Sequence, residues 1–581
     1  MHRSHNCGEL NIKNINQEVV LSGWVQNIRD LGGMIFIDLR DRYGITQLTV
    51  DINENESLFQ KAKNIGREFV LKTNGIVQER TNKNKKINTG EIEIVLKKIN
   101  ILSKSETPPF TIEEDTDGGE ELRLKHRYLD LRRKTMSENI ILRHKIAQET
   151  RNFLIKNNFL EIETPFLIKS TPEGARDFVV PSRLNKGFFY ALPQSPQTFK
   201  QLLMVAGFDR YFQLVKCFRD EDFRADRQPE FTQIDCEMSF VEEKDIYNIF
   251  SQYVKNIIKE IGGEEIKEIP KITFAESIDL YGSDKPDLRF DLKIKNIGSV
   301  CKNKGFNVFD KSENISALCL KEKSTISRKI LDSLTEFVKS PQVGGSGLIY
   351  IKCNLDGSLK SSIDKFFNES DLKEIQNICD AKKDDVIFII CGDYKKTKQI
   401  IGDLRVEIIK RFKIEPNNKF APVWVTDFPL FDFDKEKQQF HAMHHPFTAP
   451  KNEDLEKLNN APEKAIAQAY DIVLNGQEIG GGSIRIFDRK IQNKIFKLLG
   501  LSENEIKSKF GFLLEAFKYG APPHGGIAFG FDRICAIMSN EKSIRDVIAF
   551  PKNNSGKDLM IDSPSLIDND QLKDLNIKLN E

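Results

Sequence analysis

Residues 230–238 alternate strictly between two kinds of side chain, which is the pattern of a β-strand with two different faces. The face opposite the core would carry Phe231, Gln233, Asp235 and Glu237. Residues 211–218 predict another strand, and a short charged loop joins the two. The chain is therefore expected to build an antiparallel sheet here, with one polar face. That face is either solvated or part of a site, and the alternation leaves both interpretations open.

The size and charge of the chain exclude several classes of protein. Its 581 residues allow about four domains at roughly 150 residues each. With 87 Lys and Arg against 86 Asp and Glu, the net charge of +1 excludes polyanion binding by bulk charge. No apolar run approaches the ~18 residues of a membrane helix, and the start lacks a secretory signal. Nine cysteines form no CxxC pair, so a reducing cytoplasm is the expected compartment.

The first 105 residues predict a small β-barrel. Five β-rich runs lie between residues 19 and 101, which suits an OB-type barrel that binds single-stranded nucleic acid on one face. This part has 16 Lys and Arg against 12 Asp and Glu, although a solvated surface would explain that excess equally well. The Pro- and Gly-containing stretch 106–136 predicts a hinge.

The remaining chain predicts a larger domain that is interrupted. Residues 137–157 have helical spacing, and an extended segment then ends at Pro165. The Lys-, Asn- and Ser-rich stretch 287–420 has few of the polar clusters found on either side, so it is interpreted as an insertion. Strand-like sequence resumes at Pro422 and polar motifs continue to about Pro551.

Two segments before the insertion could bind an anionic ligand. The loop after Arg219 could fold over a nucleotide triphosphate, with that arginine neutralising phosphate oxygens. Ser195 is expected to cap a helix whose first residue is Pro196, which places Gln197 and Lys200 on one helix face. A plain surface helix is the alternative.

Two further segments lie after the insertion. Three glycines, 480–482, would let the backbone approach a ligand, with Arg485 just beyond them and Asp471 and Glu478 offering oxygen ligands for Mg²⁺; an ordinary glycine hairpin is the alternative. Arg533 is expected in the first turn of a helix, which favours a phosphate. Neither a P-loop nor a strand-linked GxGxxG occurs. The three histidines within 441–445 lack a fourth ligand nearby, so no zinc is expected.

In their joint order these segments resemble class II aminoacyl-tRNA synthetases, most closely the bacterial-type aspartyl family. The resemblance spans nearly the whole chain. It implies an α+β multidomain protein with an N-terminal OB-fold barrel, an antiparallel-sheet catalytic domain and an α/β insertion domain. The expected divisions are an anticodon-binding barrel at 1–105, a hinge at 106–136, a first catalytic part at 137–286, the insertion at 287–420, and a second catalytic part with a C-terminal extension at 421–581.

The resemblance also implies a reaction and its partners. L-Aspartate and ATP would form aspartyl-adenylate and pyrophosphate, and the aspartyl group would pass to the 3′-OH of the terminal adenosine of tRNA(Asp). Mg²⁺ accompanies ATP, no zinc is needed, and the family is dimeric through the segment around Pro165. No protein nucleophile is required, so catalysis would consist of positioning and charge neutralisation.

Site residues are carried over from the family by position. Arg219, Glu478 and Arg533 would be catalytic. Aspartate would be bound by Glu173, Gln197, Lys200, Arg219, Asp235, His444 and Arg485. ATP would be bound by Arg219, Asp220, Glu221, Gln228, Phe231, Glu478, Gly530, Phe531, Asp532 and Arg533. Mg²⁺ would be held by Asp471 and Glu478. The anticodon would be read by Arg29, Phe36 and Gln47.

Other functions were weighed on the same residues. A lysyl-tRNA synthetase would need acidic residues at the amino-acid side chain, whereas Arg485 and Lys200 are basic; an asparaginyl-tRNA synthetase is disfavoured less strongly. A catalytically dead RNA-binding relative should have lost Arg219, Glu478 or Arg533, and all three are present. Leu31 resembles members restricted to tRNA(Asp), so restriction is expected, with additional charging of tRNA(Asn) as the alternative.

Overall fold

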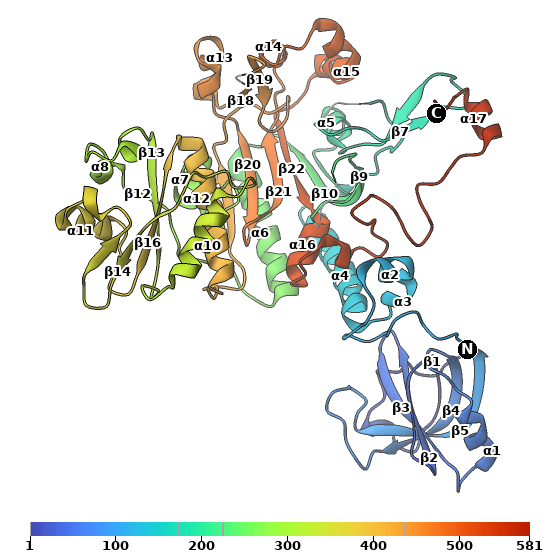
Figure 1. The fold of residues 1–581 in the computed structure, drawn as a ribbon. Coiled ribbons are helices and arrows are strands. Elements are labelled where there is room, and N and C mark those ends of the chain that lie inside the picture. The colour runs from blue at the N-terminus through green and yellow to red at the C-terminus, as the bar shows by residue number, and fades with distance from the viewer. Residues whose placement is uncertain (1, 171–173, 223–225, 435, 581) are drawn as a thin grey trace. The chain divides into compact units, whose positions relative to one another are not determined.

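The computed structural model describes residues 2–170, 174–222, 226–434 and 436–580 (Figure 1). It contains two compact units. Unit 1 comprises residues 1–141 and 545–566, and unit 2 comprises residues 142–544 and 567–581. The segment 545–566 thus packs with the N-terminal part, whereas the sequence division had grouped it with the catalytic domain. Across the described ranges, no helix combines the length and apolar character needed to cross a bilayer.

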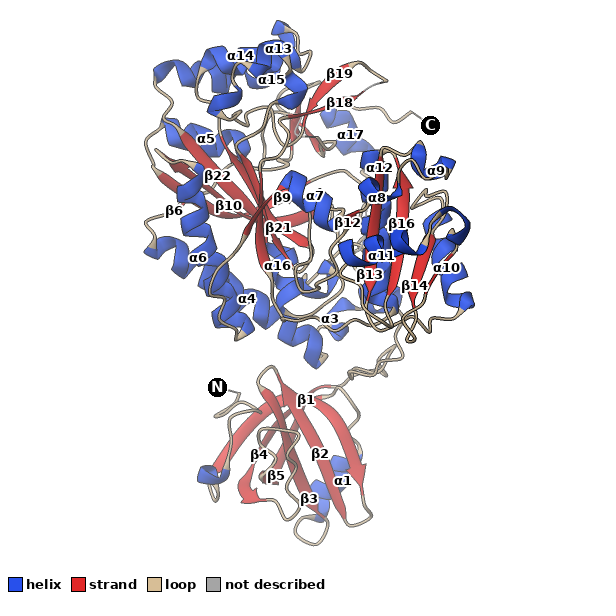
Figure 2. Cartoon of the chain, turned by 90° about the vertical axis from the view of Figure 1, so that its left-hand side faces the viewer, coloured by secondary structure: helices blue, strands red, loops and turns tan. Residues whose placement is uncertain are grey.

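Unit 1 contains the expected closed barrel, with strand order β1-β2-β3-β5-β4 (Figure 2). Alternate residues of β1, including Val19, Leu21 and Val25, are buried in its core because successive strand residues point to opposite faces. The barrel elements are β1 (Glu18–Asp30), β2 (Met34–Asp41), β3 (Gly44–Asp51), α1 (Glu56–Lys63), β4 (Val70–Glu79) and β5 (Ile92–Ser103).

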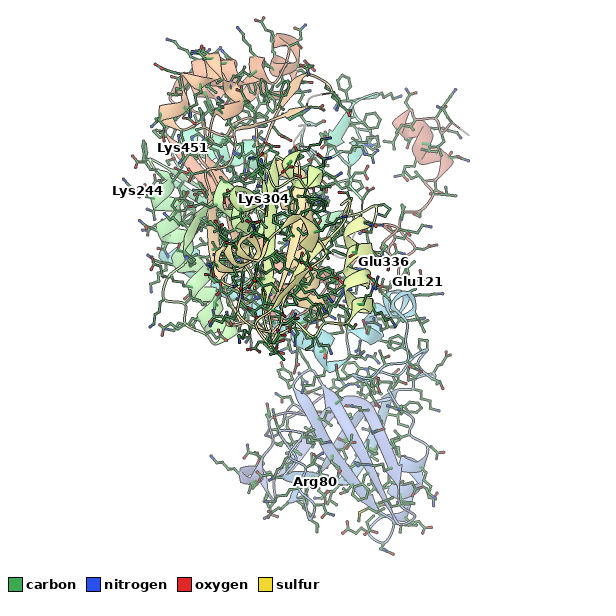
Figure 3. The ribbon with its side chains drawn as sticks, turned by 60° about the vertical axis from the view of Figure 1, so that its left-hand side comes forward. Arg80, Glu121, Lys244, Lys304, Glu336 and Lys451 are labelled. Atoms are coloured by element: carbon green, nitrogen blue, oxygen red, sulfur yellow. The ribbon has the colours of Figure 1, made fainter. Side chains whose placement is uncertain are left out.

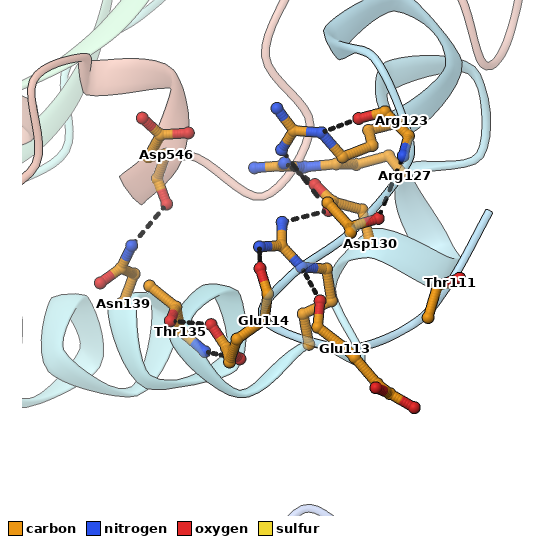
Figure 4. Close-up of polar contacts among 12 residues, drawn as sticks. Thr111, Glu113, Glu114, Arg123, Arg127, Asp130, Thr135, Asn139 and Asp546 are labelled. Carbon is orange, nitrogen blue, oxygen red and sulfur yellow. Dashed lines mark hydrogen bonds and ion pairs between the residues drawn. The ribbon is translucent and has the colours of Figure 1, made fainter. Parts of the chain in front are cut away.

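The predicted hinge contains a buried ionic network (Figure 4). Its helices are α2 (Glu120–Lys125), α3 (Arg127–Asp130) and the start of α4 (Lys134–Lys156). Asp130 is fully buried and accepts hydrogen bonds from Arg127 at 2.5 Å and Arg133 at 3.0 Å. Arg127 also donates to the carbonyl oxygens of Arg545, Ile548 and Ala549 at 2.9–3.1 Å. One carboxylate therefore orients the arginine that holds the returning C-terminal segment.

Unit 2 is built on an eight-stranded sheet, as expected for the catalytic fold. The sheet is antiparallel except at its two ends, where β11 pairs with β17 and β6 with β9 in parallel. In order across the sheet, the strands are β11 (Lys271–Thr273), β17 (Pro422–Thr426), β20 (Ala469–Leu474), β21 (Gln477–Ile484), β22 (His524–Gly530), β10 (Glu230–Ser239), β9 (Arg210–Phe218) and β6 (Leu160–Glu161).

The long helix α6 (Glu243–Gly262) covers this sheet because it has one continuous apolar face. Ile246, Phe250 and Ile257 are among its buried residues, and Gly263 ends it with a φ of +73°. Outside the insertion, unit 2 also contains α4 from Leu142 onward and the helices α5 (Gln197–Val205), α7 (Phe274–Tyr281), α13 (Lys457–Asn460), α14 (Arg489–Leu498), α15 (Glu503–Ala516), α16 (Phe531–Met538) and α17 (Asn569–Leu575). Two small hairpins are β7 (Val179–Pro181) with β8 (Phe189–Ala191), and β18 (Phe431–Asp434) with β19 (Gln439–Ala442).

The insertion forms a sheet of its own, with strand order β12-β13-β16-β14-β15. Lys304 pairs with Asp371 at 2.7 Å, and Glu336 lies on the exposed side of α10 (Figure 3). The strands are β12 (Lys295–Asn296), β13 (Asn314–Leu320), β14 (Ile349–Cys353), β15 (Leu359–Ser361) and β16 (Val386–Gly392). The helices are α8 (Gly298–Cys301), α9 (Asn307–Asp310), α10 (Arg328–Lys339), α11 (Glu369–Ile378) and α12 (Tyr394–Arg411).

Asp130→Asn is expected to destabilise unit 1 by about 3–5 kcal/mol, because it leaves the buried Arg127 without its compensating charge. Thermal unfolding of unit 1, followed by calorimetry, measures the loss. Asp115→Asn, which changes an exposed carboxylate of the same segment, is the control and should have little effect. Equal unfolding temperatures for the two variants would show that the network contributes no such stability.

Candidate active site

The polar face of β10 is buried. Asp235 and Glu237 are both 0% exposed, so the solvated-face interpretation of this strand is wrong at these positions. The reason is the position of β10 inside the sheet, between β9 and β22, with α5 packed against it. Carboxylates are almost never buried unless they are paired, so partners are expected close by.

Two basic side chains supply those partners. Lys200 Nζ lies 2.8 Å from Asp235 Oδ1 and 3.3 Å from Glu237 Oε2. Arg485 donates from Nε and Nη2 to the two oxygens of Glu237, at 3.0 and 3.2 Å. Lys200 and Arg485 are 2% and 4% exposed. The two cations predicted from sequence therefore come together, but in a quartet with two carboxylates. We call Lys200, Asp235, Glu237 and Arg485 the buried quartet.

The two carboxylates of the quartet differ electrostatically. Burial acts to raise the pKa of Glu237, but Arg485 and Lys200 outweigh it and hold the pKa at about 2. Burial raises the pKa of Asp235 above its usual value, against the opposing effect of Lys200. No hydrogen-bond donor among the described residues reaches Asp235 Oδ2, which is buried. Such an atom favours a ligand that brings a donor to it.

A hydrogen-bonded chain behind the quartet fixes the amide of Gln197. His524 is fully buried, and its Nδ1 must donate to the carbonyl oxygen of Pro522 at 2.8 Å, since a carbonyl can only accept. Its Nε2 therefore accepts from Gln201 Nε2 at 3.1 Å, and Gln201 Oε1 accepts from Gln197 Nε2 at 3.2 Å. Burial lowers the pKa of His524, which supports the neutral ring. Gln197 Oε1 is left as its accepting atom.

The helix that carries Gln197 and Lys200 starts one residue later than expected. It begins at Gln197, and Pro196 takes the capping position without a side-chain cap. Ser195 Oγ instead accepts from the Gln197 backbone N–H at 3.3 Å. Gln197 and Lys200 remain three residues apart on α5, and both are buried. The surface-helix interpretation is therefore wrong.

A cavity of about 300 Å³ lies beside β10 and β22. Arg219 is placed over the ring of Phe231, with its guanidinium carbon 5.1 Å from the ring centre, and Arg533 Nη1 donates to the carbonyl oxygen of Glu478. The predicted residues that line this cavity are Arg219, Glu221, Gln228, Phe231, Glu478, Gly530, Asp532 and Arg533. Its other described lining residues are Asp222, Asp226, Arg227, Gln233, Lys285, Ile479, Gly480, Ala528 and Ile544.

Two predicted ATP residues do not line this cavity within the described parts of the chain. Asp220 pairs by its backbone with Arg176, and Phe531 is buried with the Arg143 guanidinium carbon 4.5 Å from its ring centre. Asp532 lines the cavity, but its carboxylate is bound by Arg143 and by the Thr232 backbone N–H. Its side chain therefore holds β10 and α16 together.

Asp471 and Glu478 lie on the neighbouring strands β20 and β21. Gly481 pairs with Asp471, and a Cβ atom at Gly481 would lie 2.4 Å from Asp471 Oδ1, so a larger residue here would displace that carboxylate. Burial and the nearby Glu478 raise the pKa of Asp471 well above its usual value. Lys285 Nζ lies 3.3 Å from Glu478 Oε2. In the described chain, no group of three or more His, Cys, Asp or Glu side chains is arranged to hold a metal ion by itself.

Two more of the predicted amino-acid-binding residues, Glu173 and His444, remain to be located. Glu173 lies outside the described residues. His444 is exposed, with its ring 4.5 Å from that of Phe428. The neighbouring His445 stacks on Phe447, and burial, together with Arg485 and Lys200, lowers the pKa of His445 to about 3.

In unit 1, the three predicted anticodon residues gather on one face of the barrel. Arg29 of β1 is directly opposite Phe36 of β2, 5.8 Å from its ring centre. Arg29 Nη2 donates to Gln47 Oε1 of β3 at 3.1 Å. Leu31, in the turn between β1 and β2, is 73% exposed.

Several residues of the site were not singled out as functional from the sequence. Glu237 could have been found, because it lies two residues after Asp235 on the same strand face. Gln201 could also have been suspected, one turn after Gln197. Lys285 and His524 had no comparable signal, since each reaches the site from a segment distant in sequence from its partner.

Comparisons with known proteins match both units. Residues 19–102 match the model of an OB-fold nucleic acid binding domain, and residues 119–554 match that of tRNA synthetases class II (D, K and N). An aspartate–tRNA ligase of Flavobacterium psychrophilum is 56% identical over the whole of both chains. That of Porphyromonas gingivalis is 53% identical over 100% of this chain and 99% of its own length.

Solved structures show the same fold at low sequence identity. The asparaginyl-tRNA synthetase of Pyrococcus horikoshii, complexed with asparaginyl-adenylate, has a TM-score of 0.59 at 19% identity, covering 94% of this chain and 97% of its own. The aspartyl-tRNA synthetase of Entamoeba histolytica has a TM-score of 0.57 at 20% identity, covering 94% and 90%. The family match over residues 119–554, together with full-length identity above 50%, shows that this chain belongs to the class II tRNA synthetases, among the aspartate–tRNA ligases.

Proposed function

We propose that this chain activates L-aspartate with ATP and transfers the aspartyl group to the 3′-OH of the terminal adenosine of tRNA(Asp). The aspartate α-carboxylate attacks the α-phosphorus, and the bond to the departing pyrophosphate breaks. The 3′-OH then attacks the carbonyl carbon of aspartyl-adenylate, loses its proton, and AMP leaves. The buried quartet is the observation that supports this proposal most strongly, because it suits a ligand with both a carboxylate and an ammonium group.

Each end of aspartate has a matching group. Arg485 and Lys200 would bind the side-chain carboxylate, since Glu237 orients both cations through bonds of 3.0–3.3 Å. Asp235 Oδ2, buried and without a donor among the described residues, would accept from the ammonium group together with Gln197 Oε1. Glu173 would assist, and His444 would close the pocket. A lysine side chain would meet two buried cations, which disfavours it strongly.

The neighbouring cavity would hold ATP. Phe231 would stack on adenine, with Glu221 and Gln228 as hydrogen-bonding partners that line the cavity. Arg219 would bridge the aspartate α-carboxylate and the α-phosphate, and Arg533 would bind the γ-phosphate. These cations neutralise the charge that develops as pyrophosphate leaves, which is the main contribution of a protein to phosphoryl-type transfer. Gly530 would contribute through its backbone, and Asp532 through the strand and helix that it joins.

The donor set also fits Mg²⁺ bound with ATP. Glu478 lines the cavity, Asp471 lies on the neighbouring strand, and Mg²⁺ is commonly held by one or two carboxylates plus substrate phosphates. When bound, the ion would neutralise phosphate charge. Asp471 and Glu478 repel each other electrostatically, and a cation held by them would relieve that repulsion.

We also propose that the barrel reads the anticodon of tRNA(Asp). Arg29, Phe36 and Gln47 form one contiguous face, and a half-buried aromatic ring with an arginine beside it is a suitable platform for an unstacked base. The exposed Leu31 at the edge of this face would restrict charging to tRNA(Asp). We further propose that the chain has five functional parts. They are the barrel at 1–105, the hinge at 106–136, the first catalytic part at 137–286, the insertion at 287–420 and the second catalytic part at 421–581.

Two copies would associate through the segment around Pro165. β6 is an edge strand of the sheet, and an edge strand has unpaired backbone groups that favour pairing with another chain. Leu160, Phe166 and Leu167 are 44–54% exposed at this edge, as expected for an apolar surface that a partner covers. A cytoplasmic location agrees with nine free cysteines.

Wild-type enzyme should support aspartate-dependent ATP–pyrophosphate exchange, and Arg485→Lys should lower kcat/KM for aspartate by on the order of 10²-fold. The lysine keeps the charge but loses the two-pronged geometry fixed by Glu237. Arg489→Lys, on the exposed start of α14, is the control and should behave as wild type. Exchange with asparagine, glutamate or lysine but not with aspartate would refute the assignment.

Phe36→Leu should lower kcat/KM for tRNA(Asp) in aminoacylation by about 10- to 100-fold, since one base stack contributes about 1–3 kcal/mol. Exchange without tRNA should stay within twofold of wild type. Tyr43→Leu removes another exposed barrel aromatic, beside Arg42, and serves as the control. If Phe36→Leu also impaired exchange, or both variants lost tRNA charging equally, Phe36 would not be a specific base contact.

Purified tRNA(Asn) should be aspartylated at less than about one hundredth of the rate for tRNA(Asp), as expected if a few bases are read directly by the barrel at about 1–3 kcal/mol each. The same preparation of tRNA(Asn) should be charged normally by an asparaginyl-tRNA synthetase, which proves that it is intact. Comparable aspartylation of the two tRNAs would contradict the restriction.

A further inference from the structure

A lysine from a distant segment lines the proposed ATP cavity. Lys285 lies in the loop between α7 and β12, and its Nζ is 3.3 Å from Glu478 Oε2. Its side chain is 43% exposed and that of Glu478 is 33% exposed. A pair so accessible to solvent contributes about 0–1 kcal/mol to stability, so folding alone does not account for a cation at this point.

The other described cations that line the cavity contact different groups in the free enzyme. Arg219 lies over Phe231, Arg227 pairs with Glu221 at 2.9 Å, and Arg533 donates to the Glu478 carbonyl oxygen. A bound triphosphate brings several negative charges to this space, and the compact ammonium of lysine on its flexible stem is a common phosphate ligand. The ammonium of Lys285 lies next to the Glu478 carboxylate. That carboxylate is proposed above to bind Mg²⁺ together with ATP.

The loop that carries Lys285 is fixed by the insertion. Arg405 of α12 is 2% exposed, and it donates to three carbonyl oxygens of this loop: Asp287 at 2.8 Å, Phe290 at 3.1 Å and Leu292 at 2.7 Å. These bonds satisfy buried carbonyl groups, which makes the loop conformation costly to change.

α12 also packs very closely on α7, directly before the loop. Gly282 ends α7 with a φ of +69°, and a Cβ atom at Gly402 of α12 would lie 2.6 Å from the Gly282 carbonyl oxygen. Lys398 of α12 is 2% exposed and binds Asp279 of α7 through both its carboxylate, at 3.0 Å, and its carbonyl oxygen, at 3.1 Å. The close approach of Gly402 to Gly282 and the Lys398–Asp279 interaction both lie just before the loop, so they fix the position at which the loop starts.

We propose that Lys285 binds the β- or γ-phosphate of ATP, and that the insertion serves as its support, with Arg405 as the positioning residue. In this arrangement Glu478 holds the lysine in the free enzyme, and the ammonium would move to the phosphate oxygens when ATP binds. This inference rests on the ATP site proposed above, and it gives the insertion a role in the first step of the reaction.

The test compares ligands with and without the outer phosphates. Lys285→Met keeps the length of the side chain but removes its charge, so the KM for ATP and for pyrophosphate in exchange should rise on the order of 10- to 100-fold. Inhibition by AMP, which lacks these phosphates, and the affinity for aspartate should stay within twofold. Lys293→Met, paired only weakly with Asp291 at 3.9 Å, is the matched control.

The outcomes separate this inference from the proposed function. An unchanged KM for ATP, or equal weakening of ATP and AMP, would overturn the role of Lys285. Wild-type enzyme without aspartate-dependent exchange would instead overturn the proposed function. Lys285→Arg, which restores the positive charge, should recover part of the affinity for ATP.

A double-mutant cycle tests Arg405. Arg405→Gln should raise the KM for ATP, and adding it to Lys285→Met should cause no further rise, because both act on the same contact. Additive effects would overturn the positioning role. Asp279→Asn is a second variant. It changes a half-exposed side chain, so it is less prone to folding defects. It should raise the KM for ATP less than Arg405→Gln does, and this rise should also disappear in the Lys285→Met background. Calorimetric unfolding confirms that each variant is folded.

Discussion

Glu237 is the group on which the site depends. It is fully buried, and its two oxygens hold the guanidinium of Arg485 while one of them also faces Lys200. Without it, Arg485 would be buried without its carboxylate partner, and Lys200 would keep only Asp235. With it, both cations are held in a single geometry before any ligand arrives. The strand, the helix and the glycine-rich hairpin that deliver these residues meet at this carboxylate.

This arrangement explains how an almost neutral chain binds highly charged ligands. The quartet balances two positive and two negative side chains, so its selectivity comes from where each charge points and not from an excess of one sign. Of the two carboxylates of the quartet, only Asp235 has an oxygen that no donor among the described residues reaches. A preorganised site of this kind does not have to rearrange when charge develops, which is the main requirement for electrostatic catalysis.

The sequence predicted the parts of the site that follow from local patterns. The alternation around Asp235 correctly gives the strand, and the spacing of Gln197 and Lys200 correctly gives one helix face. The sequence could not predict that these side chains are buried, because burial depends on which strands and helices pack on either side of them. The start of α5 was misplaced by one residue, since Ser195 accepts from the next backbone N–H without forming a helical cap. The role of Lys285 could not be predicted from the sequence, because its loop comes close to Glu478 only when the sheet has folded.

The parallel pairing of β11 with β17 limits how this chain could be shortened. These strands are neighbours in the sheet but are separated by the whole insertion in sequence. Parallel neighbours cannot be joined by a tight turn, because the chain leaves one end of the sheet and must return to the other. Removal of residues 287–420 would leave residues 274–286 and 421 between the two strands, including α7. That remnant is close to the dozen or more residues that a parallel crossover needs, so a shortened enzyme has to keep α7 and the loop after it.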